Sequence, residues 1–335
     1  MMGQRHPPPL VSVVLPTFNR AEMLLQAARS VREQTLRELE ILIIDDGSSD
    51  DTPQVCSALS AQDPRVTTHR QPNSGPVAAH AAGLARASAP WVAFLDDDDL
   101  WHPEALRALL SFATGRAPTV ACLAASFETA ASTTRAEEVL GDPGRFNVRP
   151  WPPNPPGPLV SCHELVMRTI LPVNAALFGT ELLRSSGGFD LSLAAAEDYD
   201  VWLRLSARAP IPVLQRTLAL VRRHAGQTSG DLGRMVHAAR IVLTNFLQAH
   251  PEVELALGHA TVRQRLGNLA CEEAYAALLT GDRRWALRAA LAALTTNPRR
   301  AKAWAYLCFA PLPRLYQALR RSHWSHPTHD GVTVR

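Results

Sequence analysis

The feature that most constrains the fold is a series of short runs rich in apolar and β-branched residues, each followed by a longer stretch with helical periodicity. Four such runs lie between Leu10 and Pro118, at residues 10–16, 39–45, 66–70 and 91–96. Apolar runs that are continuous rather than alternating are typical of parallel strands covered by helices on both faces. The sequence therefore predicts an open α/β domain.

Polar residues directly follow three of these runs. In open α/β sheets, ligands bind beyond the carboxyl ends of the strands, which meet at one edge of the sheet. The residues concerned are Pro16 to Asn19 after the first run, Asp45 to Ser48 after the second and Asp96 to Asp99 after the fourth. We therefore expect three polar clusters to converge on one site.

The last cluster places four aspartates in a row, Asp96 to Asp99. On an extended chain, Asp96 and Asp98 point to the same side, roughly 7 Å apart. At an effective dielectric of about 20, such a like-charge pair costs on the order of 2 kcal/mol. A solvated acidic turn or an N-cap, with Asp99 before a helix predicted near Pro103, accounts for one or two of these residues. A bound Mg²⁺, whose ligands are usually carboxylates and substrate phosphates, accounts for all of them.

Glycine-rich phosphate-binding loops are absent from the sequence. It contains neither G-x-G-x-x-G nor G-x-x-x-x-G-K-[ST]. The backbone cradle of dinucleotide enzymes and P-loop NTPases is therefore missing. A bound nucleoside diphosphate would need a metal ion to neutralise its charge.

The rest of the chain is irregular at first and then strongly helical. Residues 141–158 are rich in proline and glycine and predict a long loop over the sheet edge without regular structure. A second α/β-like stretch resumes at Val173, and helical periodicity dominates from about Asp231. Residues 269–298 resemble one tetratricopeptide-like hairpin, which favours a helical cap because a repeat array needs about three or more units.

Five segments together form a specific pattern. They are VSVVLPTFNRAEMLLQAARSVREQ, LEILIIDDGSSDDT, NSGPVAAHAAGLARA, WVAFLDDDDLWHPEAL and GGFDLSLAAAEDYDVWLRL. In this order and at these separations, over about residues 10–228, they resemble the family 2 inverting glycosyltransferases with a GT-A fold, an open mixed, mostly parallel sheet flanked by helices. The predicted organisation is a disordered N-terminus (1–9), a GT-A domain (10–230) with a nucleotide-binding half (10–118) and an acceptor-binding half (119–230), a C-terminal helical appendage (231–321) and a disordered tail (322–335).

The resemblance implies which residues bind the nucleoside of the donor. Pro16, Thr17 and Asn19 would line its pocket, and Asp46 would hydrogen-bond the base, typically uracil. The neighbouring Asp45 is predicted to be structural, because only one of two adjacent strand residues can face the pocket.

The resemblance also implies a metal site. Asp96 and Asp98 match the D-x-D motif that holds Mg²⁺ or Mn²⁺ against the diphosphate of the donor, with Asp98 as the more direct ligand. His224 falls in a late motif that contacts the metal or the diphosphate. Asp97 and Asp99 would be either supporting residues or exposed ones.

Asp198 falls where the family keeps its catalytic base. Its segment predicts a helix with Val201, Trp202 and Leu205 facing inward and with Glu197 and Asp198 in the first turn. The helix dipole favours an ionised carboxylate there, as a general base requires. The alternative is that these acids only stabilise the helix start. If Asp198 removes the acceptor proton, a single displacement at the anomeric carbon gives inversion.

One segment departs from the family pattern. Where many relatives carry an Arg-Asn pair, this chain has His80 and Ala81. Sugar contacts from this helix are therefore not carried over. We expect His80 to be either a surface side chain or a hydrogen-bond donor.

Charge and cysteine content exclude several classes of protein. The net charge of +3, from 34 basic and 31 acidic residues, does not suggest nucleic-acid binding. The five cysteines are far apart, which favours reduced thiols over a zinc site or a disulfide framework. The sequence has neither an N-terminal apolar stretch of signal-peptide length nor a run of about 18 apolar residues, which predicts a cytoplasmic protein.

The C-terminal stretch has two further features. The aromatic and basic residues 302–321 favour packing against the catalytic domain, with peripheral contact at the inner face of the membrane as the alternative. His323, His326 and His329 follow at three-residue steps, but Pro327 interrupts any helix that would align them. We therefore predict a disordered tail rather than a metal site.

The combined prediction is a metal-dependent, inverting glycosyltransferase. It would move a sugar from a nucleotide sugar, with UDP-sugars favoured, to a glycan or lipid-linked acceptor in cell-surface or secreted polysaccharide biosynthesis. One alternative is a nucleotidyltransferase, although these proteins usually carry a glycine- and arginine-rich loop after the first strand, unlike PTFNRAEM. The other is a catalytically silent nucleotide-binding or partner-binding module.

Overall fold

The structure is a computed structural model that describes residues 7–128, 134–168, 171–224, 227 and 231–323. The chain divides into two compact units, residues 1–225 and 226–335, and each is described by itself. The predicted disordered ends lie mostly outside the described residues, as do His326 and His329 of the tail.

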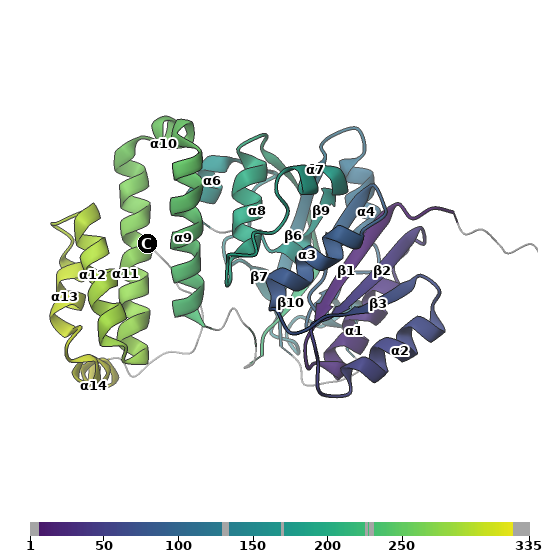
Figure 1. Ribbon diagram of the computed structural model, residues 1–335, viewed down its shortest axis with the longest axis horizontal. Helices are drawn as coiled ribbons and strands as arrows, with labels where there is room; N and C mark the ends of the chain where they lie inside the picture. The colour runs from purple at the N-terminus through teal and green to yellow at the C-terminus, as the bar shows by residue number, and fades with distance from the viewer. Residues whose placement is uncertain (1–6, 129–133, 169–170, 225–226, 228–230, 324–335) are drawn as a thin grey trace, which may run out of the picture. The chain divides into compact units, whose positions relative to one another are not determined.

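The first unit is built on one mixed sheet (Figure 1). Within the described residues the strand order is β3-β2-β1-β4-β9-β6-β10-β5, with β7 paired to β6 and β8 to β10. The strands are β1 (Val11–Thr17), β2 (Leu39–Asp45), β3 (Val66–Arg70), β4 (Trp91–Phe94), β5 (Leu100–Trp101), β6 (Thr119–Phe127), β7 (Arg149–Trp151), β8 (Leu159–Val160), β9 (Ala176–Gly179) and β10 (Ile211–Arg222). Strands β1 to β4 pair in parallel with one another, and β9 is antiparallel to β4 and β6. The predicted open, mostly parallel sheet is confirmed.

Helices connect the strands of this unit. They are α1 (Ala21–Arg32), α2 (Thr52–Gln62), α3 (Pro76–Arg86), α4 (Ala105–Ala113), α5 (Ala136–Gly141), α6 (Cys162–Met167), the short 3₁₀ helix η1 (Val173–Ala175), α7 (Thr180–Ser185) and α8 (Glu197–Ser206). Parallel strands need such crossovers, since a tight hairpin can join only antiparallel ones.

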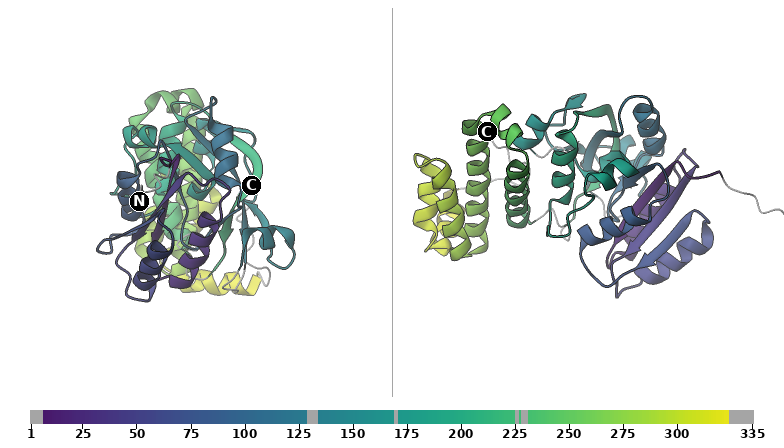
Figure 2. Two further views of the ribbon diagram at one scale, coloured as in Figure 1. Left: turned by 90° about the vertical axis from the view of Figure 1, so that its right-hand side faces the viewer. Right: turned by 45° about the horizontal axis from the view of Figure 1, so that its top comes forward.

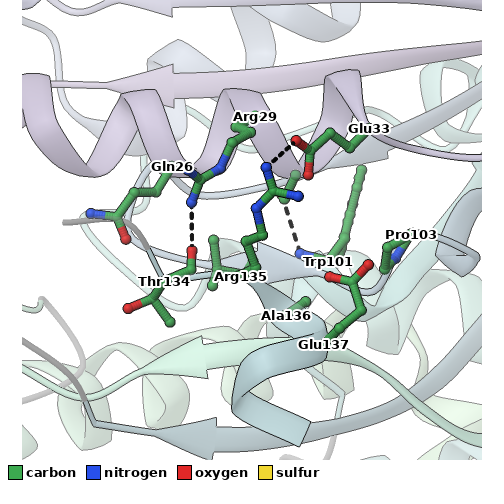
Figure 3. A pocket seen from close by; sticks show the side chains of 11 residues that line it. Gln26, Arg29, Glu33, Trp101, Pro103, Thr134, Arg135, Ala136 and Glu137 are labelled. Atoms are coloured by element: carbon green, nitrogen blue, oxygen red, sulfur yellow. Dashed lines mark hydrogen bonds and ion pairs between the residues drawn. The ribbon is translucent and has the colours of Figure 1, made fainter. Parts of the chain in front are cut away.

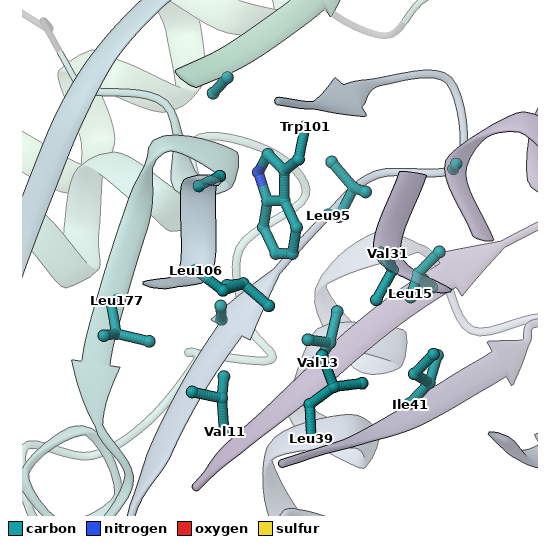
Figure 4. Packing of buried hydrophobic residues seen from close by; sticks show 14 of the residues in the cluster. Val11, Val13, Leu15, Val31, Leu39, Ile41, Leu95, Trp101, Leu106 and Leu177 are labelled. Atoms are coloured by element: carbon teal, nitrogen blue, oxygen red, sulfur yellow. The ribbon is translucent and has the colours of Figure 1, made fainter. Parts of the chain in front are cut away.

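The central strand β1 is buried along its whole length because helices cover both of its faces. On one face, Val13 and Leu15 share a buried cluster with Val31 of α1 (Figure 4). On the other face, Gly83 of α3 lies against Val14, and a Cβ at residue 83 would stand 2.2 Å from Val14 Cγ1. The glycine therefore lets α3 approach the sheet closely.

Two local predictions are wrong. Residues 141–158 were expected to lack regular structure, but β7 lies within them and pairs antiparallel with β6. A proline is compatible with such a short strand where its missing N–H is not needed for pairing. Asp99 does not directly precede a helix, because β5 follows it and α4 begins only at Ala105.

The second unit is helical, as predicted. Its helices are α9 (Leu232–Ala249), α10 (Pro251–Leu257), α11 (His259–Thr280), α12 (Arg283–Thr296), α13 (Ala301–Phe309) and α14 (Pro313–His323). Helices α9, α11, α12 and α13 lie side by side (Figures 1 and 2). In their midst, the buried Glu273 accepts hydrogen bonds from His237, Arg240 and Trp285. Among the described residues, no helix is both long and apolar enough to span a membrane.

Candidate functional site

The four aspartates form a turn at the end of β4. The backbone N–H of Asp99 donates to the carbonyl of Asp96, so the chain bends instead of running extended. Asp96, Asp98 and Asp99 each offer one carboxylate oxygen, and these oxygens lie within 4.8 Å of one another. The expected separation of roughly 7 Å on an extended chain is therefore wrong, and the turn concentrates the negative charge further.

Asp98 lies against two basic side chains. Its Oδ2 accepts a hydrogen bond from Arg20 Nη1 at 2.7 Å and lies 2.9 Å from His224 Nε2. Burial works to raise the pKa of Asp98, but the hydrogen bond to His224 and the charge of Arg20 hold it below its usual value. His224, which follows β10, is thus brought to the predicted metal ligand. Asp98 remains ionised and available to a cation.

Asp97 and Asp99 are buried, so the alternative that they are exposed is wrong. Asp97 Oδ2 accepts from Thr17 Oγ1, and burial raises the pKa of Asp97 to about 7. Asp99 accepts from the backbone of Arg222 and from the Asn174 amide, and burial raises its pKa well above the usual value. Both aspartates tie the turn to neighbouring elements.

Asp46 is also held by its surroundings. It is 4% exposed, and its carboxylate accepts hydrogen bonds from the Gln71 side chain and from the backbone N–H groups of Ser74 and Gly75. It therefore anchors the turn before α3. Nearby, Gly47 has φ +83°, and a Cβ there would stand 2.8 Å from the backbone nitrogen of Asn73.

The end of β1 borders the turn that the four aspartates form. Pro16 is the last but one residue of β1, and Thr17, the last, is buried against Asp97. Asn19 is exposed, with φ +52°, and its Oδ1 accepts from the backbone N–H of Ser49. Between them, Phe18 leaves 43% of its surface exposed. No role was predicted for Phe18, although a large aromatic residue directly after a strand was the available signal.

Asp198 lies in the first turn of α8, as predicted, with Val201, Trp202 and Leu205 buried. Its Oδ1 accepts from the backbone N–H of Tyr199 at 2.7 Å. Burial, and then the neighbouring charge of Glu197, raise the pKa of Asp198 to about 7. The helix dipole was expected to favour the ionised form of this acid, but burial and the charge of Glu197 act in the opposite direction and raise its pKa. A pKa near neutrality suits a general base.

His80 joins the two acidic groups. It is 2% exposed, so the alternative that it is a surface side chain is wrong. Its Nε2 lies 3.4 Å from Asp96 Oδ1, and its Nδ1 lies 3.6 Å from Glu197 Oε1. The ring stacks on Phe189, with centroids 5.2 Å apart. Burial works to lower the pKa of His80, but Asp96 and Glu197 raise it on balance. The aspartate turn and the start of α8 therefore form one continuous polar site.

A small crevice of about 240 Å³, part of it open to solvent, lies elsewhere in the first unit, between α1, β5 and the start of α5 (Figure 3). Its wall includes an ion pair between Arg135 and Glu33 and a hydrogen bond from Arg29 to the Thr134 carbonyl. None of the predicted site residues lines it.

Part of the first unit matches a known family in sequence. Residues 12–158 match the sequence model described as Glycosyl transferase family 2. This segment belongs to glycosyl transferase family 2. An uncharacterized glycosyltransferase of Rickettsia conorii is 39% identical over 102 residues, which are 30% of this chain and 17% of that protein. A GalNAc(5)-diNAcBac-PP-undecaprenol beta-1,3-glucosyltransferase of Campylobacter jejuni is 41% identical over 104 residues, or 30% and 34%. A chondroitin synthase of Escherichia coli is 30% identical over 202 residues, or 60% and 27%.

The alignments span only 17% to 34% of the length of these curated relatives. Solved structures extend the likeness of the family 2 domain to its fold. TarS of S. aureus superposes with a TM-score of 0.61 at 17% identity, covering 96% of this chain and 56% of that chain. The mannosyltransferase PcManGT of Pyrobaculum calidifontis, in complex with GDP-Man and Mn²⁺, gives 0.53 at 19% identity, covering 93% and 88%. The predicted GT-A fold is confirmed.

Proposed function

We propose that this protein is a metal-dependent, inverting glycosyltransferase that uses a UDP-sugar. The observation that carries the proposal is the continuity between the aspartate turn and Asp198, which His80 connects through Asp96 and Glu197. A transferase of this kind needs a site for the departing diphosphate next to a base for the acceptor, and this arrangement supplies both chemistries.

Asp96 and Asp98 would hold Mg²⁺ or Mn²⁺. Carboxylate oxygens are the ligands these hard cations prefer, and three lie within 4.8 Å of one another here. The low pKa of Asp98 keeps that ligand charged. When bound, the cation would offset the negative charge of the leaving diphosphate, and His224 stands beside Asp98 to contact either group.

The acceptor reaction would then depend on Asp198. Its carboxylate takes the proton of the acceptor hydroxyl, and the oxygen forms a bond to the anomeric carbon while the bond from that carbon to the diphosphate breaks. Attack from the face opposite the leaving group inverts the configuration. Positioned proton removal contributes about 10² to 10⁴ in rate.

The nucleoside would lie beside the end of β1, against Pro16, Thr17, Asn19 and Asp46. The exposed ring of Phe18 offers a face on which a base can stack. Asp46 already accepts three hydrogen bonds, so a bond to the base would use its remaining acceptor capacity. TarS complexes with UDP and with UDP-GlcNAc support a uridine donor, while the GDP-Man complex of PcManGT keeps a guanosine donor as the competing outcome.

The acceptor we propose is a glycan or a lipid-linked glycan of cell-surface or secreted polysaccharide. The Campylobacter glucosyltransferase, named for an undecaprenol-linked substrate, and the Escherichia chondroitin synthase support this class. Such an acceptor fits action at the cytoplasmic face of a membrane, with residues 302–321 as the peripheral contact. Their basic residues, Lys302, Arg314, Arg320 and Arg321, suit an anionic surface. Flotation with anionic and with neutral vesicles tests this contact.

Thermal unfolding with nucleotides and Mn²⁺ tests the donor and metal assignments. A ligand present at about 100 times its Kd stabilises the folded state by about 2.7 kcal/mol. We expect UDP with Mn²⁺ to raise the midpoint more than GDP with Mn²⁺, and Asp98→Ala to abolish the shift. Asp142→Ala, which removes an exposed carboxylate that accepts a hydrogen bond from the Arg145 backbone, is the matched control.

Two results would overturn the proposal. Absence of any shift with UDP and Mn²⁺ would reject the nucleoside assignment, and a full shift in Asp98→Ala would reject the metal site. Product analysis by NMR separates the alternatives. An inverted anomeric linkage supports glycosyl transfer, while release of pyrophosphate would indicate a nucleotidyltransferase.

A further inference from the structure

Arg20 forms ion pairs with two residues of the aspartate turn. It precedes α1, and its backbone N–H donates to Thr52 Oγ1 at 3.2 Å. Its Nη1 lies 2.9 Å from Asp97 Oδ1 and 2.7 Å from Asp98 Oδ2. The guanidinium therefore bridges two of the four aspartates with one nitrogen.

This ion pair is partly shielded from water. The side chains of Asp97 and Asp98 are 5% and 13% exposed, against 27% for Arg20. Burial works to lower the pKa of Arg20, but Asp97 and Asp98 raise it on balance, so the guanidinium stays charged. Attraction between such groups is much stronger than between fully solvated ones.

The oxygen that Arg20 contacts belongs to the residue expected to ligate the metal. Asp98 Oδ2 is already shared by Arg20 and His224. A divalent cation that takes Asp98 as a ligand brings two further positive charges to a carboxylate that a guanidinium already neutralises. At this range, the repulsion between the divalent cation and the guanidinium exceeds thermal energy even at an effective dielectric of about 20. The metal and Arg20 therefore cannot both engage Asp98 at full strength.

We propose that Arg20 is an internal counter-ion that competes with the divalent cation for Asp98 and moves to the diphosphate of the donor when the site loads. The inference rests on the proposed function. The planar guanidinium fork matches phosphate oxygens and forms paired, charge-assisted hydrogen bonds with them. The 27% exposure of the side chain gives it a path toward the solvent side of the turn.

This competition makes metal and nucleotide binding mutually dependent. Without nucleotide, part of the metal's binding free energy is spent on displacing Arg20. With nucleotide, the diphosphate provides a new partner for Arg20, so the metal binds more tightly. By linkage, the metal strengthens nucleotide binding by the same factor. If Arg20 had only a scaffold role and merely held Asp97 in place, the opposite would follow. Its removal would then loosen the turn and weaken metal binding.

Mn²⁺ binding to the full chain, followed by the electron paramagnetic resonance of free Mn²⁺, tests the proposal with and without UDP. We expect Arg20→Gln to bind Mn²⁺ at least about 10-fold more tightly than wild type in the absence of UDP, and the gain from adding UDP to shrink by a similar factor. Arg20→Lys keeps the charge and loses the fork, so its affinity should lie between the two. Arg70→Gln is the matched control, because Arg70 pairs with Asp45 at the same sheet edge. The Mn²⁺ affinity of this variant should stay within about two-fold of wild type.

Equal or weaker Mn²⁺ binding by Arg20→Gln would overturn the inference while leaving the proposed function intact. If wild type with UDP binds no Mn²⁺, or binds it as Asp98→Ala does, both proposals fall. A second measurement uses the unmodified protein and does not depend on the variants folding. Mg²⁺ alone should raise the phenylglyoxal reactivity of Arg20, read by mass spectrometry, and UDP with Mg²⁺ should lower it again. If saturating Mg²⁺ leaves the phenylglyoxal reactivity of Arg20 unchanged, the displacement of Arg20 from Asp98 is refuted.

Discussion

Replacing Asp198 by asparagine should make the protein more stable and much less active. Burial and the charge of Glu197 raise the pKa of Asp198 from 3.8 to about 7. At about 1.36 kcal/mol per pKa unit, this shift corresponds to a cost on the order of 4 kcal/mol for ionising the carboxyl in the folded protein. An amide of the same shape carries no charge and avoids that cost.

The direction of the pH dependence follows from the two states. Below pH 4 the carboxyl is protonated whether the chain is folded or unfolded, so Asp198 has no effect on the balance. Between pH 4 and pH 7 the unfolded chain ionises Asp198 while the folded chain keeps the proton, so wild-type stability falls as pH rises. The stability advantage of Asp198→Asn should therefore be near zero at pH 4 and reach up to about 4 kcal/mol at pH 8.

Activity should change in the opposite sense. If Asp198 is the base, Asp198→Asn lowers turnover by about 10² to 10⁴. The wild-type rate should rise with pH through about 7, the value to which burial raises the pKa of Asp198. Glu197→Gln is the matched control, because removing the neighbouring charge should lower the pKa of Asp198 and move this rise to lower pH.

Urea unfolding at pH 4.5, 6 and 8, paired with the rate of UDP release, measures both effects on the same samples. If Asp198→Asn is less stable than wild type at pH 8, Asp198 stabilises the helix start, and its ionised form does not destabilise the folded protein. Retained turnover would show that it is not the base. Either result refutes the reasoning.

Three further predictions concern the scaffold. Gly83→Ala should lower the free energy of unfolding by about 1–3 kcal/mol in urea titrations, because its Cβ would meet Val14 Cγ1 at 2.2 Å; an unchanged midpoint would mean that α3 shifts freely. Asp63→Asn should cost about 1–2 kcal/mol at pH 6, because hydrogen bonds from Arg65 lower the pKa of Asp63 to about 2. That difference should vanish as pH falls from 4 to 2, and a difference that persists at pH 2 would rule out the ionic cause. Glu273→Gln should cost about 2 kcal/mol through its weakened bonds to Arg240 and its neighbours, measured as faster proteolysis of the helical unit; unchanged proteolysis would show that the network is dispensable.

Local periodicity was enough to predict the framework of the first unit. The runs at 10–16 and 39–45 became β1 and β2, and the polar residues after them lie at strand ends. The start of α8 and its buried face were also predicted from the sequence. These features follow from which side chains must leave water, and that information is carried by neighbours in the sequence.

The proline-rich segment shows where local signals fail. Nothing within residues 141–158 indicates a strand, and β7 exists because β6 offers it a backbone to pair with. Similarly, the four aspartates follow a strand without break, yet they turn, because Asn174 and Arg222 from distant parts of the chain hold Asp99.

The sequence alone determined the α/β framework, the helical C-terminal unit and the identity of the acidic residues. The contacts of those residues depend on the fold. His80 became the buried link between Asp96 and Glu197, and Arg20 became the partner of Asp98. The reason is physical: periodicity reports which faces are covered, whereas the pKa of a carboxyl and the partner of a cation depend on groups that strand order and helix packing bring together.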